Sequence, residues 1–199
     1  MTAIEITALI ILAAFYSSFF IKMILMKRRG ISSNLLGKGQ KSDRALIVER
    51  MLKAVTYSGA CLQFASVFIA GKVWEPPVWG SLRIIGLLLA AAGTAFFITA
   101  MAAMKNNWRS GCDKHQNTSL VVSGPYKISR NPAFVGFDLL YIGCALALPN
   151  IINLLFSVLA VAVFHLQTLE EERFLENTFG DEYRLYQSQV NRYFGRSTR

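Results

Sequence analysis

The sequence is poor in the residues that build metal sites and disulfide frameworks. Its 199 residues include only 3 cysteines and 2 histidines. Cys61, Cys112 and Cys144 form no Cys-x-x-Cys pair and no Cys/His spacing typical of a zinc site. We therefore expect neither a disulfide framework nor a metal centre.

The glycine-rich motifs of nucleotide-binding folds are also missing. No Gly-x-Gly-x-x-Gly follows a candidate strand, which excludes a Rossmann-type cofactor site. The run Gly37-Lys38-Gly39-Gln40-Lys41-Ser42 lacks the spacing of a Walker A loop. It is predicted to be a flexible cationic linker that faces anionic lipid.

Acidic residues are scarce, with 12 Asp and Glu against 21 Lys and Arg, which gives a net charge of +9. In a soluble protein this balance would favour nucleic acid binding. Here the basic residues gather at the ends of apolar runs, as the positive-inside rule expects. Because 53% of the residues are hydrophobic and the mean hydropathy is positive, we predict an integral membrane protein that binds no nucleic acid.

Apolar segments predict an all-α bundle of five transmembrane helices that forms a single domain. The segments are Ile6–Ile21, which extends to about Met26, then Ala54–Gly71, Ile84–Met104, Ala133–Leu148 and Ile151–Leu169. Residues 1–104 hold the first three helices. Residues 105–199 hold a polar loop, a helical hairpin and a C-terminal segment whose tail, 173–199, is predicted to be amphipathic and cytoplasmic. The charge distribution predicts an outside N-terminus and a cytoplasmic C-terminus.

Two features of the spans suggest how they pack. Gly86, Ala90 and Gly93 lie near one face of the third helix and predict a close approach to another helix. Asp138 lies inside the fourth segment, where an acidic residue is costly in lipid. It is predicted either to face a cavity or a cationic partner, or to lie at the headgroup level.

The loop Ser123–Gly136 combines turn-formers, a cation and an aromatic residue at a membrane face. Asn131 precedes Pro132, and Pro132 is well placed as the first residue of a helix. Arg130 then lies just before a helix N-terminus, where free N–H groups and a guanidinium favour an anionic or carboxylate ligand. An interfacial turn whose Arg and Tyr contact lipid headgroups is the alternative.

A second cluster follows about 40 residues later. It comprises Glu170-Glu171-Glu172-Arg173, then Phe179-Gly180-Asp181-Glu182-Tyr183 and Tyr186. Together the two clusters resemble the isoprenylcysteine carboxyl methyltransferases and their phospholipid methyltransferase relatives, over roughly Asn106 to Phe194. Taken alone, the glutamates would be a solvated acidic cap on a tail helix.

The resemblance implies an integral membrane methyltransferase that uses S-adenosyl-L-methionine. The substrate would be a small lipidic or prenylated-type molecule that enters from the bilayer, with membrane lipids as the other partners. From the residues themselves, Arg130 suits the carboxylate of this cofactor, Tyr126 its adenine, and Glu170 or Glu171 its ribose or ammonium group.

Carried over residue by residue, the resemblance assigns the cofactor site to Thr118, Ser119, Leu120, Val121, Tyr126, Arg130, Asn131, Pro132, Ala133 and Glu171. It selects Glu171 from the acidic run, so Glu171 and Arg130 are the catalytic candidates and Glu172→Gln is expected to change little. Asn131 stands where the prenylcysteine enzymes of the family have histidine, and Gln167 stands where they have arginine. The methyl acceptor stays open among carboxylate, amine, thiol and phenol.

Two other functions are compatible with the sequence. One is an NADPH-dependent membrane reductase of the sterol-reductase type, for which a single basic loop residue, Arg130, offers little to a 2′-phosphate. The other is a non-catalytic scaffold or transport subunit. Asp138 is nearly the only ionisable residue inside the spans, which argues against a transport pathway. The oligomeric state stays open.

Overall fold

The computed structural model describes residues 1–38, 41–70, 80–111 and 119–196. Its helices are α1 (Ala3–Arg28), α2 (Asp43–Ile69), α3 (Gly80–Met104), α4 (Pro132–Ala147), α5 (Ile151–Phe179) and α6 (Asp181–Gln189), with two short 3₁₀ turns, η1 (Lys105–Asn107) and η2 (Gly124–Lys127). The described ranges contain no strand, only two isolated bridges, which confirms the predicted all-α class.

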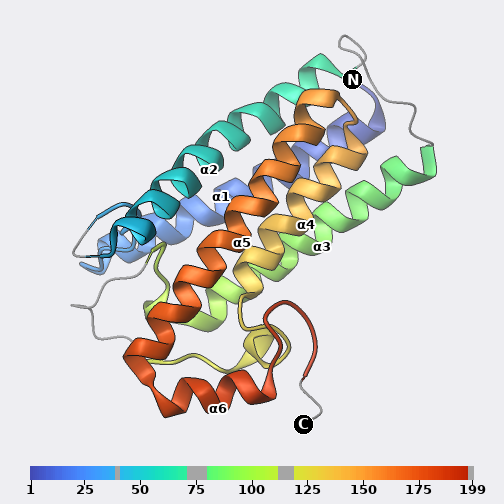
Figure 1. The fold of residues 1–199 in the computed structure, drawn as a ribbon. Helices are drawn as coiled ribbons and strands as arrows, with labels where there is room; N and C mark the ends of the chain where they lie inside the picture. The colour runs from blue at the N-terminus through green and yellow to red at the C-terminus, as the bar shows by residue number, and fades with distance from the viewer. Residues whose placement is uncertain (39–40, 71–79, 112–118, 197–199) are drawn as a thin grey trace.

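The helices α1 to α5 run alongside one another in alternating directions (Figure 1). The N-terminus and the C-terminus therefore lie at opposite ends of the bundle. The described parts of the α1–α2 connection and of the segment between α3 and α4 lie at the C-terminal end, together with α6. This arrangement brings the two sequence clusters to the same end of the molecule.

Four helices, α1, α2, α3 and α5, are long and apolar enough to cross a membrane. The fourth predicted span, α4, has only 16 residues and is shorter than the others. Four of the five predicted spans are therefore candidate spans in the structure, and the fourth predicted segment forms a shorter apolar helix, so a fifth span stays a prediction. Proline sets both limits, because Pro132 is the first residue of α4, as predicted, and Pro149 follows its end.

Glycines allow α3 and α4 to approach closely. A Cβ atom on Gly143 would lie 2.5 Å from the backbone nitrogen of Ala90 and from the carbonyl oxygen of Gly86. A Cβ on Gly93 would lie 2.6 Å from the carbonyl oxygen of Gly136. Because these distances leave no room for a side chain, the predicted small-residue packing of the third helix is confirmed.

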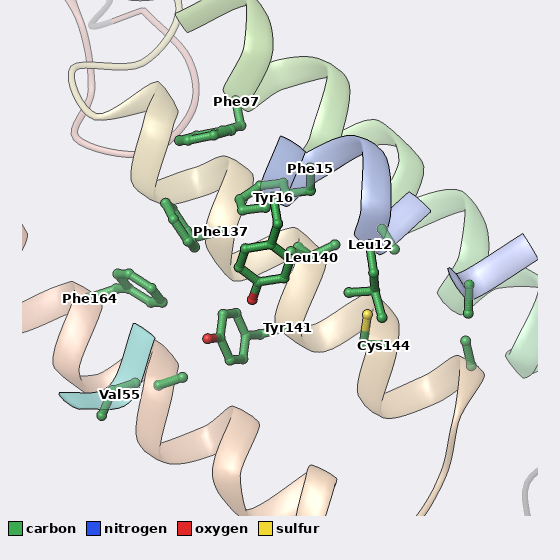
Figure 2. Close-up of a cluster of buried hydrophobic side chains, with 14 of the residues drawn as sticks. Leu12, Phe15, Tyr16, Val55, Phe97, Phe137, Leu140, Tyr141, Cys144 and Phe164 are labelled. Atoms are coloured by element: carbon green, nitrogen blue, oxygen red, sulfur yellow. The ribbon is translucent and has the colours of Figure 1, made fainter. Parts of the chain in front are cut away.

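A cluster of aromatic rings joins four helices at the centre of the bundle (Figure 2). Phe15 of α1 stacks on Phe97 of α3 at 4.4 Å between ring centroids. Phe137 of α4 lies 5.0 Å from Phe97 and 4.8 Å from Phe164 of α5. Each such pair contributes about 0.5–1.5 kcal/mol beyond its buried area, so this cluster sets the relative positions of the helices.

The fifth helix, α5, continues past Leu169, where its membrane span is predicted to end. It runs unbroken to Phe179, because residues 151–179 contain neither glycine nor proline. Gly180 then adopts φ +53°, in the left-handed region that favours glycine, and separates α5 from α6. The predicted tail, 173–199, thus begins within the last turns of α5 and continues as the nine-residue α6, after which an isolated bridge joins Val190 to Arg196.

Asp138 lies on α4 and is partly buried. Its Oδ1 atom is buried without a hydrogen-bond partner, and it makes no ion pair with any residue that the structure describes. It interacts electrostatically with Tyr193 of the C-terminal end. The prediction of a cationic partner is therefore not met over the described residues.

Candidate functional site

Turn-forming residues order the loop between η2 and α4. Gly124 adopts φ +63° and Pro125 occupies the first turn of η2. The N–H groups of Ile128 and Ser129 both donate to the carbonyl oxygen of Pro125 at 3.1 Å. This geometry buries Tyr126, which is 8% exposed.

The C-terminal segment holds this loop in place. The backbone N–H of Arg130 donates to the carbonyl oxygen of Asn191 at 3.1 Å. The hydroxyl of Tyr186 on α6 donates to the carbonyl oxygen of Tyr126 at 2.6 Å. The loop conformation therefore depends on residues about sixty positions further along the chain.

Glu172 is the acidic residue that faces the loop. Its carboxylate is 4% exposed and accepts hydrogen bonds from Arg130 at 3.1 Å, from Asn131 at 2.8 Å and from Arg192 at 2.9 Å. The hydrogen bonds from Arg192 to Glu172 raise the pKa of Arg192. The family resemblance selects Glu171 from the acidic run, whereas in the structure α5 presents Glu172 to Arg130.

Most of the guanidinium of Arg130 is bonded to the protein itself. Its Nε and Nη2 atoms donate to Glu172, and its Nη1 atom donates to the carbonyl oxygen of Val190 at 2.8 Å. The side chain is 11% exposed. This arrangement orders the loop and leaves little of the guanidinium for the carboxylate of a ligand.

Beside this loop lies a cavity of about 190 Å³. Three rings of the aromatic cluster, those of Phe97, Phe137 and Phe164, form part of its lining. Trp108, which is 4% exposed, lines it as well and packs edge-on against Phe19 at 5.6 Å. The cavity is therefore apolar over much of its surface, and its polar groups come from a few side chains.

Most of the predicted cofactor residues line this one cavity. They are Ser119, Leu120, Val121, Tyr126, Arg130, Asn131, Ala133 and Glu171. Pro132 is buried at the start of α4 and does not line it, and Glu170 instead pairs with Arg44 at 2.9 Å and Arg173 at 2.8 Å. Thr118 lies outside the described residues.

Glu171 supplies a partly buried carboxylate to the cavity. The amide nitrogen of Gln167 donates to its Oε1 atom at 3.0 Å, and Gln167 is itself only 1% exposed. Burial raises the pKa of Tyr126, and the nearby charge of Glu171 raises it further, so the phenol stays neutral. The cavity thus combines a hydrogen-bond-accepting carboxylate with a neutral aromatic ring.

Several lining residues have no counterpart among the predicted ones. Arg109 follows Trp108 in the polar segment between α3 and α4. Leu35, Leu52 and Thr56 come from the α1–α2 connection and α2. No sequence pattern identifies these three, because nothing in their own segments distinguishes a residue that faces a ligand from one that faces lipid or another helix.

No group of three His, Cys, Asp or Glu side chains that could hold a metal ion occurs in the described part of the chain. The fold and site together define a membrane-embedded helical bundle whose cavity is built from an Arg-Asn-Pro loop and the acidic end of a long helix. Residues 82–182, about half of the chain, match the family model described as phospholipid methyltransferase. The chain belongs to this family.

Two curated relatives are similar to the chain. It is 33% identical over 137 residues to a protein-S-isoprenylcysteine O-methyltransferase of Schizosaccharomyces pombe, which covers 65% of this chain and 54% of the relative. It is 32% identical over 112 residues to a protein of the same description from Xenopus laevis, which covers 55% of this chain and 39% of the relative. The chain thus spans about half of the first relative's length and about two fifths of the second's.

Proposed function

We propose that this protein is an integral membrane methyltransferase that uses S-adenosyl-L-methionine to methylate a small lipidic or apolar substrate. One observation carries the proposal. Eight residues that the family resemblance assigns to the cofactor site come from three separate stretches of the chain and line a single cavity. The names of the two curated relatives support methyl transfer as the reaction.

The side chains in the cavity suit the groups of this cofactor. The carboxylate of Glu171 can accept hydrogen bonds from ribose hydroxyls or from an ammonium group. The neutral ring of Tyr126 and the apolar side chains of Leu120 and Val121 suit adenine. Burial raises the pKa of Glu171 to about 7, and the positive charge of a bound sulfonium would favour its ionised form.

Arg130 takes a different role in this proposal from the one that the sequence suggests. Because its guanidinium bonds to Glu172 and to the carbonyl oxygen of Val190, it is a positioning residue for the loop. Asn131 is likewise bonded to Glu172 while it lines the cavity. Glu171 then remains the acidic side chain in the lining that contacts the cofactor.

When bound, S-adenosyl-L-methionine would supply an activated methyl group. The nucleophile would form the new bond with its own electron pair, and the sulfur would keep the electron pair of the broken bond and become a neutral thioether. The protein then needs to hold both partners in line and to exclude water. Trp108, Phe134 and Phe137 make the cavity lining apolar, which excludes water. Gln167 orients the carboxylate of Glu171 by its hydrogen bond.

The apolar part of the substrate would reach the cavity from lipid. A smaller cavity of about 50 Å³ shares Phe19, Leu36 and Thr56 with the larger one and lies between α1 and α2. Its outer lining includes Phe20 and Tyr57, which are 52% and 53% exposed. A lipidic acceptor that enters between α1 and α2 would therefore remain in contact with apolar groups along its path.

The cavity would open toward the cytoplasm. The α1–α2 connection and the segment before η2 carry half of the basic residues outside the helices, and the described parts of both lie at the same end as α6 (Figure 1). Basic residues favour the cytoplasmic side of a membrane. The N-terminus would then lie outside and the C-terminus in the cytoplasm.

The test is a thermal-shift assay on detergent-purified protein with S-adenosylhomocysteine and NADPH side by side. At one hundred times its dissociation constant, S-adenosylhomocysteine should stabilise the protein by about 2.7 kcal/mol. NADPH should produce no shift. Glu171→Gln should remove most of the S-adenosylhomocysteine shift, whereas Glu176→Gln on the same helix should keep it, because Glu176 pairs with the exposed Arg184.

Wild-type protein that shows no shift with S-adenosylhomocysteine would refute the proposal. A shift with NADPH alone would favour a reductase. Transfer of a labelled methyl group from S-adenosyl-L-methionine to N-acetyl-S-farnesylcysteine, and to a chloroform extract of membranes, would then identify the class of acceptor.

A further inference from the structure

One part of the cavity is built outside the stretch that matches the family model. Leu35 and Leu36, from the α1–α2 connection, line the cavity, whereas the matched residues begin at position 82. Backbone hydrogen bonds fix this connection to the segment after α3. The N–H of Leu35 donates to the carbonyl oxygen of Ser110, and the N–H of Ser110 donates to that of Ser33, both at 2.9 Å.

A buried ion pair holds the connection against α2. Glu49 of α2 is 2% exposed and accepts hydrogen bonds from the ammonium group of Lys41 at 2.6 and 2.7 Å. It also accepts the backbone N–H of Gly37 at 2.7 Å. Lys41 in turn donates to the carbonyl oxygen of Leu35 at 2.9 Å. The pair therefore bonds to the backbone of Leu35 and of Gly37, on either side of Leu36.

The pair is also close to the acidic end of α5. Lys41 and Glu49 both interact electrostatically with Glu171. Next to them, Arg44 at the start of α2 pairs with Glu170 at 2.9 Å. The α1–α2 connection thus lies beside the carboxylate that we assign to the cofactor.

Gly111 shows how tightly the pair is enclosed. It adopts φ +86°, and a Cβ atom there would lie 3.0 Å from the Oε1 atom of Glu49 and 3.1 Å from the carbonyl carbon of Leu35. Gly111 itself lines the cavity. The backbone after α3 therefore closes over the ion pair, and any movement of the pair would move the cavity lining.

We propose that Lys41 and Glu49 are a positioning pair that fixes the α1–α2 connection as a wall of the cavity beside Glu171 and so retains the bound cofactor. The proposal rests on the proposed function for the identity of the ligand. The contacts of the ion pair with the α1–α2 connection do not depend on which ligand the cavity binds. Because a fixed wall slows the escape of a ligand, its loss raises the dissociation rate more than it changes the association rate.

The test compares Lys41→Met, Glu49→Gln and the double variant Lys41→Met/Glu49→Leu with the wild type. Each single variant leaves one buried partner of the ion pair without the other and should lower the melting temperature. The double variant replaces the pair by apolar side chains of similar size and should restore most of the melting temperature. It cannot replace the bonds to Gly37 and Leu35.

S-adenosylhomocysteine binding then separates positioning from stability. All three variants should bind it about tenfold more weakly, mainly through faster dissociation measured by stopped-flow fluorescence. The matched control Lys38→Met, at an exposed lysine of the same connection, should bind it like the wild type. If the affinity of the double variant returns to the wild-type value together with its melting temperature, the pair is merely structural and the proposal is wrong.

Hydrogen exchange gives a readout that needs no ligand. The amides of Leu35 and Gly37 should be protected in the wild type and exchange faster in the double variant, while amides in the middle of α3 stay protected. Unchanged exchange at these two amides would overturn the positioning role. Wild-type protein that binds no S-adenosylhomocysteine would instead overturn the proposed function, and the exchange result would still decide the role of the pair.

Discussion

The substitution Glu172→Gln tests which glutamate holds the loop and which one contacts the cofactor. In the wild type, the carboxylate of Glu172 accepts hydrogen bonds from Arg130, Asn131 and Arg192 while it is 4% exposed. Breaking a buried ion pair by removing one partner costs about 3–5 kcal/mol. Arg192 is 37% exposed, so water can solvate part of its charge once the partner is gone.

Glutamine also keeps an amide oxygen that can accept one of the original hydrogen bonds. We therefore expect the free energy of unfolding of Glu172→Gln to fall by about 2–3 kcal/mol. For a chain of this length, each kcal/mol lowers the melting temperature by about 2–4 °C, so the expected decrease is about 4–12 °C. Thermal unfolding of the detergent-purified protein, followed by circular dichroism, measures it directly.

Glu171→Gln is the matched comparison, because it makes the same chemical change one residue away. It should leave the melting temperature nearly unchanged and weaken S-adenosylhomocysteine binding by about 10- to 100-fold, as expected for a lost hydrogen bond to a charged group worth about 1.5–3 kcal/mol. The reasoning fails if Glu172→Gln melts within about 1 °C of the wild type. It also fails if Glu171→Gln is the variant that loses stability.

Three further predictions concern packing, topology and the tail. Gly143→Ala should destabilise the bundle by about 2–3 kcal/mol, because its Cβ would lie 2.5 Å from the backbone of α3. The control Gly80→Ala should be neutral, because a Cβ there meets nothing within 4 Å. The melting temperatures of the two variants measure the difference. A cysteine at Ser42 should react with an impermeant maleimide only from the cytoplasm, and one at Thr2 only from outside; the opposite labelling would contradict the topology. A chain that ends at Gln189 loses the backbone bond to the Arg-Asn-Pro loop and should bind S-adenosylhomocysteine more weakly by calorimetry; unchanged affinity would show that the tail does not hold the loop.

Local chemistry in the sequence was sufficient to predict many elements. Uninterrupted apolar runs predict α1, α2, α3 and α5, because only a helix satisfies its own backbone in lipid. Pro132 predicts the start of α4 by its fixed φ and missing N–H. The spacing of Gly86 and Gly93 predicts a close helix contact, although not that α4 is the partner.

The two motif clusters could also be placed at one end of the bundle from the sequence, since an even number of crossings returns the chain to the same side. The resemblance to a family then named residues that the structure brings to one cavity. Tyr126, Ala133 and Glu171 are examples, although they are separated by up to about 45 positions. Their proximity follows from topology, which charge and hydropathy largely determine.

The direction of individual side chains at that end depended on the tertiary structure. Successive residues of α5 point about 100° apart, so one position of helical phase decides whether Glu171 or Glu172 faces the loop. The packing of α5 against its neighbours sets this phase. No local pattern in Glu170-Glu171-Glu172 distinguishes the residue that pairs with Arg130 from the one that lines the cavity.

The sequence did not predict the part of the cavity lining that comes from the α1–α2 connection. Leu35 and Leu36 line the cavity where Lys41 and Glu49 pair in the interior and where Gly111 allows the backbone after α3 to approach them. The contacts of Gly111 with Leu35 and Glu49 join positions more than sixty residues apart. The free energy of these contacts comes from desolvation and close packing of side chains that show no pattern in their own segments. Both contributions arise only once the helices have assembled.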